Sequence, residues 1–147
     1  MSEARNTQIV KDAYAAFLRG DIAAILAMVD DAVQWQGVIG TEGVLPQAGL
    51  RQGRDAVAEF FGQVGATVGF DEFTPGEFIA QGDHVAVVGS YRGRAKTTGE
   101  RFEMAWVMVF TIRDGKIARF REFTDSAQLV RAFAVPARHS SEVPVTL

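Results

Sequence analysis

The chain has 147 residues, a length typical of one domain, and its composition, 48% hydrophobic and 22% charged, is that of a globular protein. A formal net charge of -3 argues against a nucleic-acid partner, because binding to a phosphate backbone needs clustered lysine and arginine. The absence of cysteine excludes disulfides and favours a reducing compartment. With a charged N-terminus and no apolar run long enough for a bilayer, the sequence predicts a cytoplasmic protein without a membrane partner.

The first half of the chain is predicted to be mainly helical. Apolar residues recur there at three- and four-residue spacing, which indicates helices with one buried face. Gly20 ends the first helix, and Asp21 can cap the second by accepting a free first-turn amide. The pattern predicts helices at 7–19, 22–29 and 55–64 and a short strand at 32–36.

A glycine-rich stretch without periodicity separates the short strand from the third helix. Residues 37–53 contain five glycines and Pro46. Loops of this length inside a compact domain are uncommon and are usually lids, binding loops or disordered segments. The stretch is therefore a candidate for covering a binding site.

The second half of the chain changes to the two-residue period of β-strands. The predicted strands are 70–80, 84–96, 100–112 and 116–124, followed by a short helix at 127–134. Because short turns join these strands, they pair antiparallel. The fold class is α+β, with one domain over residues 1–134 and a C-terminal tail at 135–147.

One predicted strand is apolar on both faces. Residues 104–110 read Met-Ala-Trp-Val-Met-Val-Phe, whereas an antiparallel strand with one face in water alternates apolar and polar residues. The predicted helices suffice to cover one face only. We therefore expect a homodimer that packs through the outer face of the sheet.

The order of these elements resembles the nuclear transport factor 2-like superfamily, and within it the SnoaL-like and ketosteroid-isomerase-like branch. The matching segments are Gly20-Asp21, Asp30 to Trp35, Gly53 to Val57, Thr98-Gly99, and Arg113 to Ile117 running into Arg121 to Asp125. The resemblance covers roughly residues 7 to 134. It implies a curved sheet wrapped around the helices into a cone, with an apolar pocket at the wide end as the default site for a small ligand.

The resemblance also implies an acid/base residue at the end of the last strand. SnoaL-like members use an aspartate there, and the matching residue is Asp125. The alternative is that Asp125 caps the last helix, because Asp125-x-x-Gln128 fits a capping box. By strand parity Arg121 shares a face with Asp125 and could orient it or bind an anionic oxygen, although a single bulge would place Glu122 inward instead.

Large flat or pliable side chains form the predicted pocket lining, since they suit steroid-like, terpenoid or aromatic ligands. A role in the core is the alternative for each of them. The predicted lining residues are Tyr14, Trp35, Met104, Trp106 and Met108.

Several acid/base residues of related enzymes are absent. Gln36 stands where ketosteroid isomerases carry their aspartate base, and no carboxylate stands near 106–108, where they carry a second acid. Met108 replaces the histidine of cyclase-like members. The resemblance therefore makes steroid isomerisation improbable and leaves Asp125 as the remaining acid/base residue.

Neither metal nor cofactor is expected. His84 and His139 lack partners at ligand spacing, and no nucleotide-binding motif is present. The sequence thus predicts a pocket for an apolar small molecule bearing a carbonyl or hydroxyl group. It leaves two functions open: a cofactor-independent isomerase, cyclase or dehydratase, and a non-catalytic binding or dimerisation module.

Overall fold

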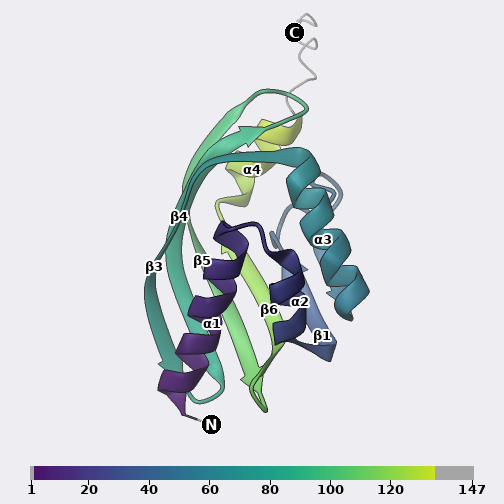
Figure 1. The fold of residues 1–147 in the computed structure, drawn as a ribbon. Coiled ribbons are helices and arrows are strands. Elements are labelled where there is room, and N and C mark those ends of the chain that lie inside the picture. Colours follow the sequence, from purple (N-terminus) through teal and green to yellow (C-terminus); the bar gives the residue numbers. More distant parts are fainter. Residues whose placement is uncertain (1, 135–147) are drawn as a thin grey trace, which may run out of the picture.

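The computed structural model describes residues 2–134, which form four helices and six strands (Figure 1). The elements are α1 (Glu3–Leu18), α2 (Ile22–Met28), β1 (Val29–Gly37), β2 (Gly49–Gln52), α3 (Arg54–Thr67), β3 (Val68–Gln81), β4 (His84–Ala95), β5 (Arg101–Arg113), β6 (Lys116–Thr124) and α4 (Ser126–Ala134). The predicted tail, 135–147, lies outside the described residues. The α+β class predicted from the sequence is confirmed.

All six strands belong to one sheet, in the order β2-β1-β6-β5-β4-β3. Strands β3 to β6 form the predicted antiparallel meander. Strand β1 joins β6 in parallel, which brings Trp35 opposite Phe120. This pairing was not predicted, because it joins segments that are far apart in the sequence.

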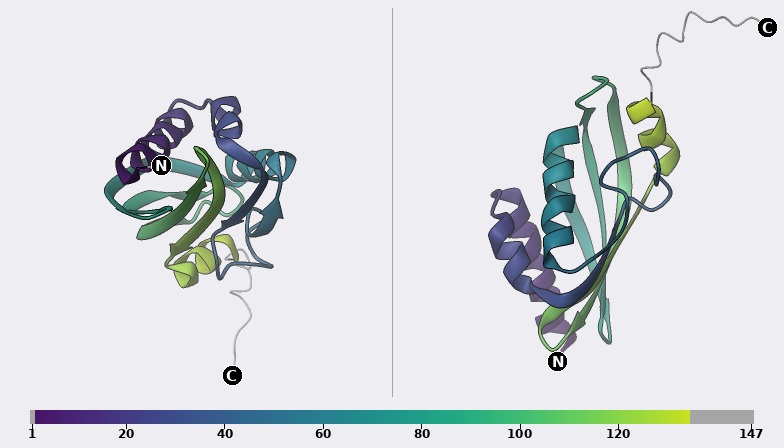
Figure 2. Two further views of the ribbon diagram at one scale, coloured as in Figure 1. Left: turned by 90° about the horizontal axis from the view of Figure 1, so that it is seen from below. Right: turned by 90° about the vertical axis from the view of Figure 1, so that its right-hand side faces the viewer.

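The sheet is strongly curved, and α1, α2 and α3 lie along its concave side (Figures 1 and 2). Helix α4 lies at the end of the sheet away from the N-terminus. Each long helix turns an apolar stripe toward the sheet: Val10 and Tyr14 of α1 are buried, as are Val57 and Phe60 of α3. None of the helices in the described part of the chain is long and apolar enough to cross a bilayer.

The glycine-rich stretch contains a strand that the sequence did not predict. Its last part forms β2, which pairs antiparallel with β1. Its middle part packs inward, with Thr41 and Leu45 buried and the Thr41 hydroxyl donating a hydrogen bond of 2.8 Å to the carbonyl of Val38. The middle of the segment therefore packs into the core of the protein.

Strand β5 carries apolar side chains on both faces, as its sequence indicates. Trp106, Met108 and Phe110 are buried toward the helices, while Val107 and Val109 are half-buried on the opposite face. The pairing of β5 with its neighbours places Val88 and Phe123 beside Val107, and Phe123 is 41% exposed. Helices α1 to α3 all lie on the other side of the sheet.

Candidate functional site

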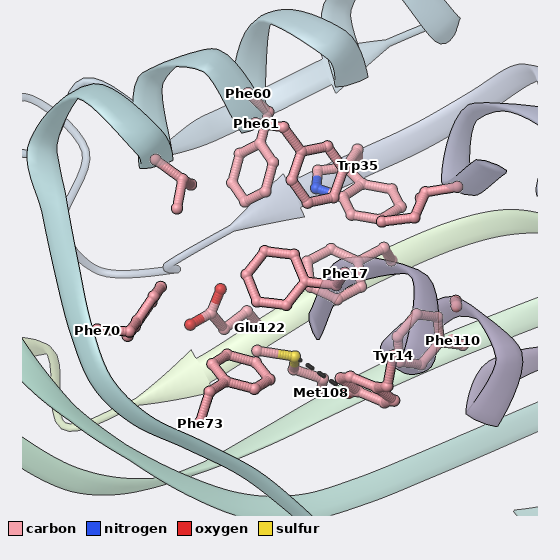
Figure 3. Close-up of a pocket in the computed structure, with 14 residues that line it drawn as sticks. Tyr14, Phe17, Trp35, Phe60, Phe61, Phe70, Phe73, Met108, Phe110 and Glu122 are labelled. Carbon is pink, nitrogen blue, oxygen red and sulfur yellow. Dashed lines mark hydrogen bonds between the residues drawn. The ribbon is translucent and has the colours of Figure 1, made fainter. Parts of the chain in front are cut away.

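A cavity of about 80 Å³ lies between the helices and the concave face of the sheet (Figure 3). Its walls come from α1, α2, α3, β1, β3, β5 and β6, so the whole fold is needed to build it. Nearly all of the lining is aromatic or aliphatic. The lining residues are Ala13, Tyr14, Phe17, Ile25, Trp35, Phe60, Phe61, Val64, Phe70, Phe73, Met108, Phe110, Phe120 and Glu122.

Glu122 brings the one ionisable carboxyl group to this lining. Its side chain is buried, and its carboxyl group points into the space between Phe17, Phe70 and Phe73 (Figure 3). The Tyr91 hydroxyl donates a hydrogen bond of 2.8 Å to Oε2, and the backbone N–H of Val38 donates a second one to the carboxylate. These two hydrogen bonds fix the orientation of the carboxyl group.

Burial raises the pKa of Glu122 from 4.5 to about 7, although the hydrogen bonds from Tyr91 and Val38 act in the opposite direction. Desolvation dominates because an apolar cavity disfavours the charged form. At neutral pH the group therefore populates both its neutral and its ionised form. A carboxyl group with this pKa can both accept and donate a proton.

A β-bulge turns Glu122 inward. From Trp106 to Thr111, β5 pairs with β6 in one regular register, which ends with Thr111 opposite Arg119. The next pair is Ile112 opposite Ile117, so Ala118 has no partner on β5. The extra residue reverses the alternation of faces in the rest of β6. Phe120 and Glu122 consequently face the helices.

Tyr14 places a hydroxyl group in the same cavity. It donates a hydrogen bond of 3.2 Å to Sδ of Met108, and both residues line the cavity (Figure 3). Burial, and secondarily the charge of Glu122, raises the pKa of Tyr14 well above its ordinary value. The phenol thus stays protonated, and its present acceptor, a thioether, is weak.

Three of the five predicted lining residues, Tyr14, Trp35 and Met108, lie in the cavity wall. Trp106 and Met104 are buried in the core outside the wall. Trp106 stacks against Tyr14 at a centroid distance of 5.9 Å, so it supports a lining residue from behind.

Asp125, the predicted acid/base residue, lies in a different environment from the one expected. Asp125 is exposed and lies outside the cavity lining. Its Oδ1 accepts a hydrogen bond of 3.2 Å from the backbone N–H of Gln128, and its Oδ2 accepts one of 3.4 Å from Nε2 of that residue. These contacts are those of a helix cap, and they explain the sequence pattern without a role in the pocket.

Arg121 also lies outside the cavity, because its neighbour Glu122 faces inward and adjacent strand residues point to opposite faces. Its guanidinium group lies 5.9 Å from the centroid of the Phe123 ring on the outer face. The face of β6 that carries Arg121 is directed away from the cavity, and Asp125 lies beyond Thr124, the last residue of that strand. Glu122, the buried acid, could be found from the sequence only by assuming a bulge in β6.

The curved sheet, its covering helices and the apolar cavity between them define the fold of the nuclear transport factor 2-like proteins. The SnoaL-like domain family matches residues 10–120, and the chain belongs to this family. No functionally curated protein matches the chain significantly.

Several solved structures share the fold. An NTF2-like protein from Burkholderia xenovorans LB400 is 38% identical with a TM-score of 0.81, over 90% of this chain and 98% of that one. An NTF2-like protein from Burkholderia thailandensis E264 is 33% identical with a TM-score of 0.78, over 90% and 98% of the two chains. TerC, co-crystallised with polyporic acid, is 28% identical with a TM-score of 0.77, over 88% and 98% of the two chains.

Proposed function

We propose that this protein binds a small, mostly apolar molecule bearing a carbonyl or hydroxyl group in the cavity, and that Glu122 moves a proton on it. The observation that carries the proposal is a buried carboxyl group, with a pKa of about 7, aimed into an aromatic cavity. Isomerisation, cyclisation and dehydration are the reaction classes that use one such acid/base group. A cytoplasmic location, and function without metal or cofactor, remain predictions from the sequence.

Two polar groups of the cavity, those of Glu122 and Tyr14, have complementary roles in this proposal. The ionised carboxylate of Glu122 takes a proton from the carbon next to a carbonyl, and the electron pair of that C–H bond moves onto the carbonyl oxygen. The Tyr14 hydroxyl leaves Met108 Sδ for the better acceptor that this oxygen provides. The proton then returns from Glu122 to the same or another carbon.

The structure of TerC supports a small organic ligand for this fold, since that protein was co-crystallised with polyporic acid. The apolar walls supply binding energy through burial of ligand surface, at about 25 cal/mol per Å². The acid that the related enzymes carry at the end of the last strand is replaced in this proposal by Glu122, three residues earlier.

Proton exchange in D₂O tests the proposed function. Acetophenone has one ring, a carbonyl and exchangeable methyl protons, and proton NMR follows their replacement by deuterium. The wild-type protein is expected to accelerate the exchange over buffer alone. Glu122→Gln, which keeps the shape of the side chain but cannot accept the proton, should reduce the rate to that of buffer. Asp125→Asn is the matched control and should exchange like the wild type.

A non-catalytic binding module is the second candidate, and the same experiment separates the two. Chemical shifts of cavity residues that move with acetophenone, without faster exchange in the wild type, would favour binding alone. Loss of exchange in Asp125→Asn but not in Glu122→Gln would contradict the assignment of the acid. The apolar cavity between the helices and the sheet supports a pocket in either case.

We further propose a homodimer formed through the outer face of the sheet. Val88, Val107 and Val109 form an apolar centre there, with Phe123 exposed beside them. Arg121 borders this centre on β6. An apolar centre with a polar rim is the usual composition of a protein interface, and a second copy offers a matching surface under twofold symmetry.

A further inference from the structure

Four phenylalanine side chains of the cavity wall, Phe17, Phe61, Phe70 and Phe73, form a group that we call the phenyl collar (Figure 3). All four are half-buried, whereas the deeper lining residues such as Trp35 and Phe120 are buried. The collar thus lies between the cavity and the solvent.

The collar rings pack against one another in a continuous row. The centroids of Phe17 and Phe73 are 4.9 Å apart, those of Phe70 and Phe73 are 5.3 Å apart, and those of Phe17 and Phe61 are 6.0 Å apart. These separations are typical of favourable aromatic pairs. Opening the row requires the loss of at least one such contact.

Three separate elements supply the collar, which fixes its width. Phe17 comes from the last turn of α1, Phe61 from α3, and Phe70 and Phe73 from β3. Helix α1 is anchored on the sheet by the buried residues Val10 and Ala13. The collar therefore widens only if a phenyl side chain rotates away or one of these elements shifts.

The volume of the cavity that the collar helps to line limits the ligand. At about 80 Å³ the cavity is smaller than the engineered apolar cavity of about 150 Å³ that accepts benzene, and far below the roughly 300–1,000 Å³ of pockets for drug-sized molecules. One ring inside the cavity already requires slight relaxation of the walls. A second fused ring would have to occupy the space of a collar phenyl.

We infer that the phenyl collar makes this protein selective for a ligand with a single ring that bears a hydroxyl or carbonyl group, and that it excludes fused-ring systems. This inference rests on the proposed binding function of the cavity. It names the size class of the ligand. It assigns Phe73 as the main specificity-determining residue, because its ring joins the collar to the buried rings of Tyr14 and Trp106, with centroids 6.2 and 5.4 Å away.

Titrations with phenol and 2-naphthol test the inference, with the dissociation constants measured by NMR. Both compounds carry one hydroxyl group, and they differ by one fused ring. The wild type is expected to bind phenol and to bind 2-naphthol at least tenfold more weakly. In Phe73→Ala the space of one ring is released, so the affinity for 2-naphthol should rise at least tenfold. Leu18→Ala, at an exposed position on α1, is the matched control.

The more conservative Phe73→Leu provides the same comparison if the alanine variant does not fold, with a smaller gain for 2-naphthol. Tighter binding of 2-naphthol than of phenol by the wild type would overturn the inference, as would equal affinities for 2-naphthol in wild type and collar variants. If these outcomes occur while both compounds still bind, the selectivity is overturned but the proposed binding function stands. Failure of both compounds to bind the wild type and Phe73→Ala would overturn the inference together with the binding function.

Discussion

At the scale of single residues, Glu122 combines two costs that natural cores usually avoid, burial and potential charge. Its hydrogen bonds to Tyr91 and Val38 partly offset the desolvation of the carboxylate, and the remaining penalty raises its pKa to about 7. Because the folded pKa lies above the unfolded value of about 4.5, the folded state binds the proton more tightly. The acid is thus retained at an expense in stability at neutral pH.

This penalty predicts a specific pH dependence of stability. The contribution of Glu122 is fully present below about pH 4.5 and is lost as the pH rises through about 7, a total of about 3 kcal/mol. The Glu122→Gln side chain does not ionise. Between pH 4 and pH 8 the free energy of unfolding of the variant, relative to that of the wild type, should therefore rise by about this amount. Urea denaturation at the two pH values measures the difference. Parallel pH profiles of the two proteins would show that Glu122 ionises normally.

At the scale of elements, the sequence predicts which helices and strands of the second half exist. It does not predict which side chains of β6 point toward the cavity. The two-residue period places four strands, and the Arg113 turn defines the hairpin between β5 and β6. Periodicity cannot show the bulge at Ala118, because the bulge arises from pairing with β5. The unpaired residue therefore turns Glu122 inward and Arg121 outward, the reverse of what parity with the strand end indicated.

The parallel pairing of β1 with β6 was not predicted either, because local sequence patterns do not reveal pairing between distant segments. It depends on long-range contacts such as the stacking of Trp35 on Phe120, with centroids 4.1 Å apart. The local signals of the first strand indicate only a short extended segment. By contrast, the helix caps are local, and Asp21 accepts from Ala24 N at 3.1 Å as predicted.

The cap of α4 gives a prediction at this scale. Asp125→Ala removes the acceptor of the Gln128 N–H and should lower the free energy of unfolding by about 1 kcal/mol. Because Asp125 lies outside the cavity lining, the affinity for phenol should be unchanged. Chemical denaturation and the NMR titration measure the two quantities. A weaker affinity for phenol in the folded variant would contradict this prediction and would indicate that Asp125 takes part in ligand binding.

At the scale of the whole molecule, the two faces of the curved sheet have different surroundings. The concave face, covered by α1 to α3, encloses the cavity, and the other face presents Val88, Val107 and Val109. Both properties follow from the composition of β5, whose side chains are apolar on each side. The sequence could therefore predict that both faces of β5 are apolar, although it could not show which residues border the cavity.

The proposed dimer predicts that one charge in the centre of the outer face separates the subunits. Val107 is half-buried within one chain, and a second chain would desolvate it fully, so Val107→Glu should leave the monomer folded but disfavour association by several kcal/mol. Light scattering at micromolar concentration should give twice the monomer mass for the wild type and the monomer mass for the variant. Leu18→Glu, at a position that is 58% exposed on α1, is the control and should stay dimeric. A wild-type protein of monomer mass would contradict the dimer, while the cavity and its acid would be unaffected, because both are built from a single chain.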